Sequence, residues 1–273
     1  GDVMVIDVGI VQMNSSESYE DNLAFSEHMI AEAAERKLNL LAFPETFLYV
    51  GKDHSAKHKV AEKLETEILP RFSQLAKQSH CALLLGSVYE LTDEDSGRLF
   101  NTSIFIDRDG KEKARYRKIH MCDAVPLGYM ESAGIKPGDK TVVIDHELGR
   151  LGFSVCYDLR FPDLFRSLSD KGAEIIFVPA AFFLHTGKHH WLPLLIARAI
   201  ENQVYIVAPN QWGHHYGDRT SYGSSVIIDP WGSILCCAPE RVGLTLSRID
   251  IEYLRQVRSN MPLHTHRRPE LYV

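Results

Sequence analysis

Strand-like and helix-like segments alternate along the chain, and this alternation restricts the possible folds more than any other feature. Short apolar runs bounded by proline, glycine or charged residues are separated by segments with helical spacing of apolar residues. The expected strands cover residues 3–13, 38–45, 81–90, 99–118, 140–155 (two strands), 173–182, 204–211, 224–238 and 242–251. The expected helices cover residues 20–37, 56–79 with a break at Pro70, 160–172, 189–203 and a short segment from Glu252.

Two of these strand segments, 99–118 and 224–238, are typical of hairpins, with turns at residues 107–110 and 230–232. Hairpins mixed with crossover connections predict an α/β protein whose sheets contain both parallel and antiparallel strands. No internal repeat or linker-like change in composition divides the 273 residues. We therefore expect a single domain over residues 1–260 and an irregular tail over residues 261–273.

Composition excludes several classes of function. The net charge is −6, so no basic surface favours nucleic acid or an anionic membrane as a partner. The longest apolar runs are shorter than the roughly 20 residues of a membrane span, and the first residues do not resemble a signal peptide. The 5 cysteines are odd in number and form no C-x-x-C pair, which indicates a reducing compartment. We expect a cytoplasmic protein.

Three expected strands each end on one conspicuous polar residue: Glu45, Lys118 and Cys156. Strand ends in α/β sheets commonly form the crevice that holds catalytic groups. An ammonium lowers the pKa of a nearby thiol, a carboxylate can accept the thiol proton, and the ammonium can stabilise an oxyanion. The pattern alone also allows a core cysteine, a solvated turn glutamate and a surface lysine, because residues so far apart in sequence need not meet.

The 13 histidines raise the question of a metal site. They cluster at 189–190, 214–215 and 264–266, but none shows the H-E-x-x-H pattern or cysteine partners at zinc spacing. We therefore expect neither a metal nor another cofactor.

Longer stretches around these residues carry a resemblance to a known family. The segments "AFPE", "YRKIHM" and "GFSVCYDLRFPD" resemble the three signature blocks of the nitrilase, or carbon–nitrogen hydrolase, superfamily, in the order of the family. Further similarity lies in "MES", "HTGKHHW", "ARAIENQVYIV", "SYGSSVIIDPWG" and "HRRPELY", and so covers nearly the whole chain. The later blocks are most similar to the branch of amidases that act on deaminated glutathione, with the ω-amidases beside it.

The resemblance implies a role for each matching residue. Glu45 matches the general base, Lys118 the oxyanion-stabilising lysine and Cys156 the nucleophile, while Glu131 matches a second glutamate that orients the lysine and the substrate amide. The backbone N–H of Tyr157 is expected to assist at the oxyanion. The matching pocket positions are Arg160, expected to hold a substrate carboxylate, Phe182, Thr186 and, at the entrance, Tyr49.

Some of these positions also have a purely structural interpretation. Arg160 lies four residues after Cys156, so a helix starting there places both on one face, and a guanidinium suits a carboxylate ligand. Arg160 can equally form a surface ion pair with Asp158 or Asp163, and Phe182 can be a core residue. The sequence departs from the family at Asp163, at 188–189 and at Ser224, which leaves substrate identity open.

The fold implied by the resemblance is a four-layer α-β-β-α sandwich with two mixed sheets. Two subunits would pair into an eight-layer homodimer, with the tail over residues 261–273 contacting the partner. The implied activity is hydrolysis of an amide bond in a small carboxylate-bearing substrate, such as deaminated glutathione or the ω-amide of a 2-oxo acid, through a thioester. The alternatives are N-carbamoyl hydrolysis, nitrile hydrolysis, or a dimeric scaffold without catalytic activity.

Overall fold

Two six-stranded sheets form the centre of the structure, a computed structural model that describes residues 5–94 and 96–272. Residues 3–4 of the first expected strand lie outside the described residues. The first sheet has the order β16 (Gly243–Asp250), β1 (Val5–Gln12), β2 (Leu40–Ala42), β3 (Ala82–Leu91), β4 (Leu99–Ile106) and β5 (Glu112–Arg117). Strands β1, β2 and β3 are parallel and the other neighbours antiparallel, so the sheet is mixed.

The second sheet is also mixed. Its order is β15 (Ile234–Cys237), β14 (Val226–Ile228), β11 (Tyr205–Ala208), β10 (Ile175–Phe177), β9 (Gly149–Phe153) and β8 (Val143–His146). Strands β9, β10 and β11 are parallel, with antiparallel strands on both sides. Two small hairpins stand apart from the sheets: β6 (Asp123–Ala124) with β7 (Tyr129–Met130), and β12 (Trp212–Tyr216) with β13 (Arg219–Tyr222).

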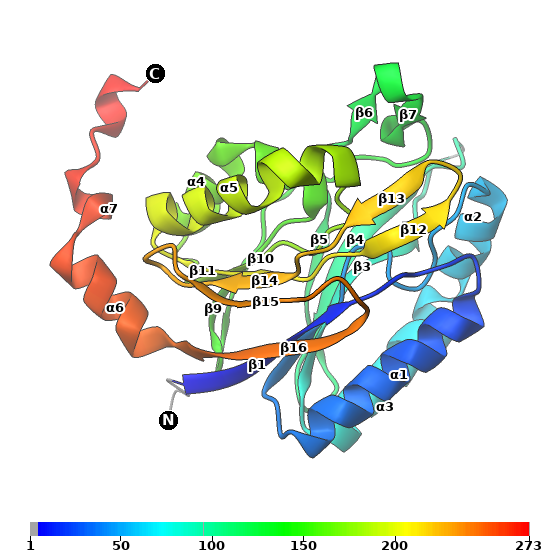
Figure 1. The fold of residues 1–273 in the computed structure, drawn as a ribbon, viewed down its shortest axis with the longest axis horizontal. Coiled ribbons are helices and arrows are strands. Elements are labelled where there is room, and N and C mark those ends of the chain that lie inside the picture. The colour runs from blue at the N-terminus through cyan, green and yellow to red at the C-terminus, as the bar shows by residue number, and fades with distance from the viewer. Residues whose placement is uncertain (1–4, 95, 273) are drawn as a thin grey trace.

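Helices cover the outer faces of both sheets. Figure 1 shows α1 (Tyr19–Glu35) and α3 (Leu69–Ser79) along one side, and α4 (Pro162–Asp170) and α5 (Leu184–Asn202) along the other. The α/β class and the two mixed sheets flanked by helices are confirmed. No helix among the described residues is both long and apolar enough to cross a membrane.

The period-2 alternation of the strands explains this layering. In β2, Leu40 and Ala42 point into the apolar core shared with the second sheet, whereas Leu41 packs with the core beneath α1 and α3. In β3, Leu84 points into the core shared with the second sheet and Leu83 into the core beneath α1 and α3. The side chains of β2 and of β3 up to Glu90 are buried on one face or the other, which is why residues 40–42 and 82–85 form continuous apolar runs.

Two expected helices differ from the structure in their limits. The helix predicted over residues 56–79 is divided into α2 (His54–Glu62), a π-helical turn (Leu64–Ile68) and α3. The break precedes Pro70, which lies in the first turn of α3, where a proline replaces an N–H that has no helical partner. The helix predicted over 189–203 begins earlier, at Leu184, as part of α5.

The C-terminal segment contains more helix than predicted. The helix α6 (Ile251–Asn260) begins at the Asp250 cap, which accepts backbone N–H groups of Glu252 and Tyr253. It is followed by the short helix α7 (Leu263–His266) and a 3₁₀ turn (Pro269–Leu271) instead of an irregular tail. In Figure 1 this segment extends away from the two sheets.

Candidate active site

The ends of β2, β5 and β9 bring together the three residues that the sequence singled out. Glu45 follows β2 after Phe43 and Pro44, Lys118 follows β5 directly, and Cys156 lies three residues beyond β9. Although β5 belongs to the first sheet and β9 to the second, Lys118 and Cys156 line the same cavity, together with Glu45. The expected convergence of a carboxylate, an ammonium and a thiol is therefore present in the structure.

Lys118 is held between two carboxylates. Its Nζ atom donates to Glu45 Oε1 at 3.0 Å and to Glu131 Oε1 and Oε2 at 2.9 Å each. Glu131 begins a 3₁₀ turn (Glu131–Ala133), and its Oε1 also accepts the backbone N–H of Cys122 at 2.8 Å. All three charged side chains are buried, with Lys118 only 2% exposed. A buried ammonium needs such partners because an unpaired charge in the interior is very unfavourable.

The Glu45 carboxylate is fixed from several directions. Its Oε1 also accepts the Asn101 side-chain amide at 2.9 Å, and its Oε2 accepts the backbone N–H of Ala181 at 2.9 Å. The Cys156 thiol donates a hydrogen bond to the same carboxylate. Glu45 therefore connects the buried lysine with the sulfur.

These contacts determine the charge of each group in the resting site. Burial raises the pKa of Glu45, but the Lys118 charge and the hydrogen bond from Cys156 outweigh it, so the pKa is lowered overall. Burial lowers the pKa of Lys118, but the charges of Glu131 and Glu45 outweigh it and raise the pKa well above its ordinary value. The resting site thus holds an ionised glutamate and a protonated lysine.

The thiol differs from the sequence-based expectation that the neighbouring ammonium lowers its pKa. Burial and the charge of Glu45 raise the pKa of Cys156 well above its ordinary value, although Lys118 opposes this. Desolvation and a nearby carboxylate both disfavour a thiolate. Cys156 is therefore a neutral thiol at rest, and a base would have to remove its proton before the sulfur could act as a nucleophile.

A sharp turn presents the Cys156 sulfur to the cavity. Val155 is extended, Cys156 has a left-handed φ of 46°, and a 3₁₀ helix (Cys156–Arg160) follows. The buried Asp158 carboxylate holds this turn by accepting the Val155 backbone N–H at 2.9 Å and the Tyr116 hydroxyl at 2.6 Å. A left-handed non-glycine residue is unfavourable and persists only where its surroundings enforce it.

Four of the five remaining predicted residues border the cavity of Cys156, which has a volume of about 310 Å³. They are Tyr157, Arg160, Phe182 and Thr186. Phe182 is also part of the core and packs at a tilt of 50° against Trp191, with the ring centroids 5.0 Å apart. Tyr49 is the exception: its side chain is buried in the core beside α1 and is not among the residues lining the cavity of Cys156.

Arg160 has no carboxylate partner among the described residues. Its Nη1 atom lies 3.1 Å from His190 Nδ1, and its Cζ atom lies 5.0 Å from the Phe182 ring centroid. The ion pairs with Asp158 or Asp163 that the sequence also allowed are not formed, because Asp158 is directed into the turn and Asp163 is exposed on α4. The guanidinium is available to an anion in the cavity.

The departures from the family pattern are divided between the cavity rim and the scaffold. Lys188 borders the outer opening of the site, whereas Ser224 has a left-handed φ of 51° and its carbonyl accepts the Trp191 indole N–H at 2.9 Å. Of these two changes, only that at Lys188 lines a cavity, one that shares Phe183, Thr186 and Arg219 with the cavity of Cys156.

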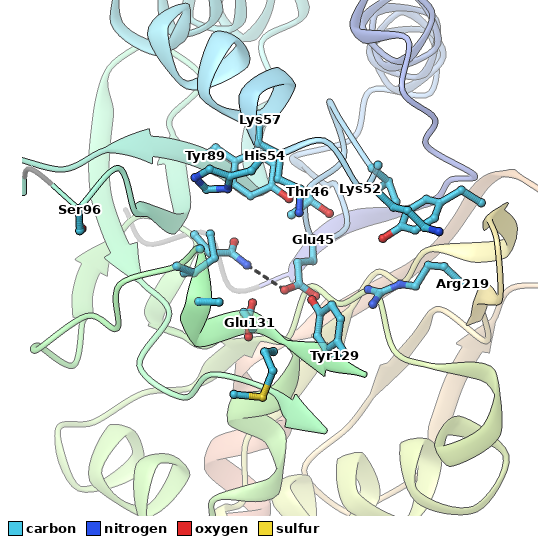
Figure 2. A pocket seen from close by; sticks show the side chains of 18 residues that line it. Glu45, Thr46, Lys52, His54, Lys57, Tyr89, Ser96, Tyr129, Glu131 and Arg219 are labelled. Carbon is cyan, nitrogen blue, oxygen red and sulfur yellow. Dashed lines mark hydrogen bonds between the residues drawn. The ribbon is translucent and has the colours of Figure 1, made fainter. Parts of the chain in front are cut away.

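Sequence reasoning did not identify Arg219 as a site residue. It is the first residue of β13 and lines the cavity of Cys156 and a neighbouring cavity of about 390 Å³ (Figure 2). Residues 212–222 lack an alternating apolar pattern, so neither the hairpin nor the position of its arginine was predictable. The only available signal was an arginine next to the "SYGSS" block.

Comparison with known proteins defines the class of the chain. The sequence model of the carbon–nitrogen hydrolase family matches residues 7–259. The chain belongs to this family and is a hydrolase of carbon–nitrogen bonds other than peptide bonds. This confirms the resemblance seen in the three signature blocks.

Individual relatives are similar over nearly the whole chain. The deaminated glutathione amidase of Dictyostelium discoideum is 40% identical over 275 residues, covering 97% of this chain and 94% of the relative. The deaminated glutathione amidase of a Synechocystis strain is 40% identical over 262 residues, covering 94% and 96%. The crystal structure of the Caenorhabditis elegans NitFhit protein has a TM-score of 0.95 at 36% identity, covering 100% of this chain and 67% of that one.

Proposed function

We propose that the chain is a cofactor-free thiol amidase in which Cys156 is the nucleophile and Glu45 the general base. Glu45 accepts the thiol proton while the sulfur forms a bond to the amide carbon. The oxyanion that results is stabilised by the Lys118 ammonium and the Tyr157 backbone N–H. The carbon–nitrogen bond then breaks, and Glu45 gives the proton to the departing nitrogen.

Hydrolysis of the thioester completes the cycle. Glu45 accepts a proton from water, the water oxygen bonds to the thioester carbon, and the carbon–sulfur bond breaks. The proton returns to the sulfur, and a carboxylate product leaves. Glu131 takes no part in proton transfer and orients Lys118 and the substrate amide.

The observation that carries this proposal is the buried Glu131–Lys118–Glu45 array that ends on the Cys156 thiol. A scaffold without catalytic activity gains nothing from two carboxylates, an ammonium and a thiol in one buried array, since burying charge is unfavourable. The lowered pKa of Glu45 and the raised pKa of Cys156 fit a base and the acid that it deprotonates.

We propose deaminated glutathione as the substrate, with the ω-amide of a 2-oxo acid as the second candidate. Two relatives at 40% identity carry the name deaminated glutathione amidase. Both substrates have a 2-oxo acid carboxylate, which the unpaired Arg160 guanidinium would bind at the same cavity. The bond cleaved differs only in whether the departing group is a peptide-like amine or ammonia.

We also propose that the protein is a homodimer and that the tail over residues 261–273 contacts the partner. Met261, Leu271 and Tyr272 are exposed by 46%, 64% and 70%. Apolar side chains so exposed are favoured to become buried against another surface. Sedimentation as a monomer at micromolar concentration would contradict this.

The proposed activity is tested by measuring release of amine or ammonia from deaminated glutathione, 2-oxoglutaramate and an N-carbamoyl amino acid. The wild type should hydrolyse at least one of the first two, and Cys156→Ala should lose turnover while keeping its circular dichroism spectrum. Cys237→Ala, which removes an exposed thiol on β15, is the matched control and should retain activity. Turnover by a folded Cys156→Ala protein would contradict the proposed mechanism.

A further inference from the structure

The Arg219 guanidinium lacks partners for most of its hydrogen-bond donors. Its Nη2 atom donates to the Ala181 carbonyl at 3.3 Å, but the buried Nε and Nη1 atoms have no hydrogen-bond partner. Its Cζ atom lies 4.2 Å from the Phe183 ring centroid and 5.1 Å from that of Tyr129. Buried donors without an acceptor are unfavourable. An anionic ligand would supply the hydrogen-bond acceptors that these two nitrogen atoms lack.

The second cavity that Arg219 borders has an excess of positive charge. Lys52 and Lys57 line it as well, and neither forms an ion pair with a described residue. Burial and the charge of Arg219 lower the pKa of Lys57. The acids of this cavity, Glu45 and Glu131, share the single Lys118 ammonium, which leaves one negative charge against the three cations Lys52, Lys57 and Arg219. The net charge facing the space is therefore positive.

The position of Glu45 between the two cavities indicates which part of a substrate the second cavity would hold. Glu45 borders both cavities, whereas Arg160 and Cys156 border only the first (Figure 2 shows the second). The departing nitrogen must lie beside Glu45, which protonates it. A substituent on that nitrogen can therefore continue past Glu45, away from Arg160, into the cavity lined by Arg219.

We propose that Arg219, with Lys57, forms a subsite for a carboxylate on the departing amine, so that the enzyme prefers substituted amides whose leaving group is anionic. The inference rests on the proposed function, because it assigns the acid end of the substrate to Arg160 and the amine end to Arg219. Deaminated glutathione fits this arrangement, since it has a 2-oxo acid carboxylate at one end and a glycine carboxylate at the other.

The test compares deaminated glutathione with its C-terminal carboxamide, which differs only by the loss of the distal charge. The wild type should show a kcat/KM ratio of acid to carboxamide of about 10 or more, as expected for a charge-assisted hydrogen bond. Arg219→Met should bring this ratio close to 1. Lys57→Met should reduce it in part, and this variant serves if Arg219→Met fails to fold.

Arg160→Lys is the matched control, because both substrates share the 2-oxo acid end. It should lower kcat/KM for the two equally and leave their ratio unchanged. A purely structural role of Arg219 would likewise affect both substrates equally, so an unchanged ratio in Arg219→Met overturns the subsite. Equal turnover of the two substrates by the wild type overturns it too, while leaving the amidase intact. A wild type that hydrolyses 2-oxoglutaramate but neither of these two substrates would also overturn the subsite and leave the amidase intact. Failure to hydrolyse all three substrates would instead contradict the proposed function.

Discussion

Both carboxylate oxygens of Glu131 accept hydrogen bonds from the Lys118 ammonium, each at 2.9 Å. Because the third bond of Nζ goes to Glu45, the ammonium has no freedom to rotate or withdraw. Glu131 in turn is anchored by the Cys122 backbone N–H. The position of the lysine thus depends on a residue that lies 13 positions away in the chain.

Glu131→Gln should lower kcat by about 100-fold, because misplacing a catalytic group by about 1 Å has an effect of that size. An amide keeps the shape of the side chain but removes the charge and one acceptor. Steady-state kinetics on deaminated glutathione measure the change. Glu94→Gln, which alters a half-buried ion pair with Arg98 away from Lys118, should leave kcat within about twofold. A normal kcat in folded Glu131→Gln would show that Lys118 needs no second carboxylate.

Asp158→Asn should destabilise the turn that carries Cys156, the proposed nucleophile. Besides the Val155 N–H and the Tyr116 hydroxyl, the carboxylate accepts the backbone N–H and, at 2.7 Å, Nδ1 of His120. The amide nitrogen of asparagine would face one of these donors, so the free energy of unfolding should fall by about 2–4 kcal/mol. Urea denaturation measures it, and kcat should fall more than KM rises.

Asp163→Asn is the control for this variant, since Asp163 is an exposed aspartate in the first turn of α4. Its charge interacts only with the helix terminus, so the change should stay below about 1 kcal/mol. Equal destabilisation by the two variants would contradict the role assigned to Asp158.

The pH dependence of kcat/KM should reflect Glu45 on its acid side. The enzyme needs Glu45 ionised, and the pKa of this carboxyl is below its ordinary value of about 4.3. Activity should therefore be level through neutral pH and fall only when pH drops below about 4. Short assays with circular dichroism at each pH separate this loss from unfolding. An acid limb centred near pH 6 would contradict an ionised resting Glu45.

His215 should make stability depend on pH between about 6.5 and 4. The ring lies within hydrogen-bond distance of the Ser15 carbonyl and the Ser221 hydroxyl, and burial lowers the pKa of His215 to about 4. An unfolded histidine titrates near 6.5, so unfolding takes up a proton in this window. The free energy of unfolding should then fall as pH drops, by up to about 3 kcal/mol.

Denaturation of wild type and His215→Asn across this window provides the measurement. Asparagine can still donate to the Ser15 carbonyl but does not titrate. The free energy of unfolding of His215→Asn should therefore lack the fall between pH 6.5 and 4 that His215 causes in the wild type. Parallel curves for the two proteins would contradict the assignment.

The strands were predictable because burial on both faces requires continuous apolar runs, as in β2 and β3. A break in the helix over 56–79 was predictable from Pro70, but the π-helical turn over Leu64–Ile68 that forms it was not, because it has no distinct pattern in sequence. The hairpin of β12 and β13 was missed for a related reason. Its strands lie outside both sheets, so they are not selected for alternating apolar residues.

The site was predictable where a polar residue ends an apolar strand, as at Glu45, Lys118 and Cys156. Asn101, which donates to Glu45, lies within β4 among buried residues and carries no such signal. Arg219 depends on tertiary placement alone. The charge state of Cys156 was also beyond the sequence, because burial and the proximity of Glu45 decide it.

The left-handed backbone at Cys156 also limits which nucleophile this position can hold. Branching at Cβ makes φ near +46° less favourable for threonine than for the unbranched serine, although Thr46 shows that this fold can hold a threonine at φ 48°. During divergence of such enzymes, a single substitution could exchange sulfur for a primary hydroxyl without added backbone strain, while a secondary alcohol would add strain to the turn.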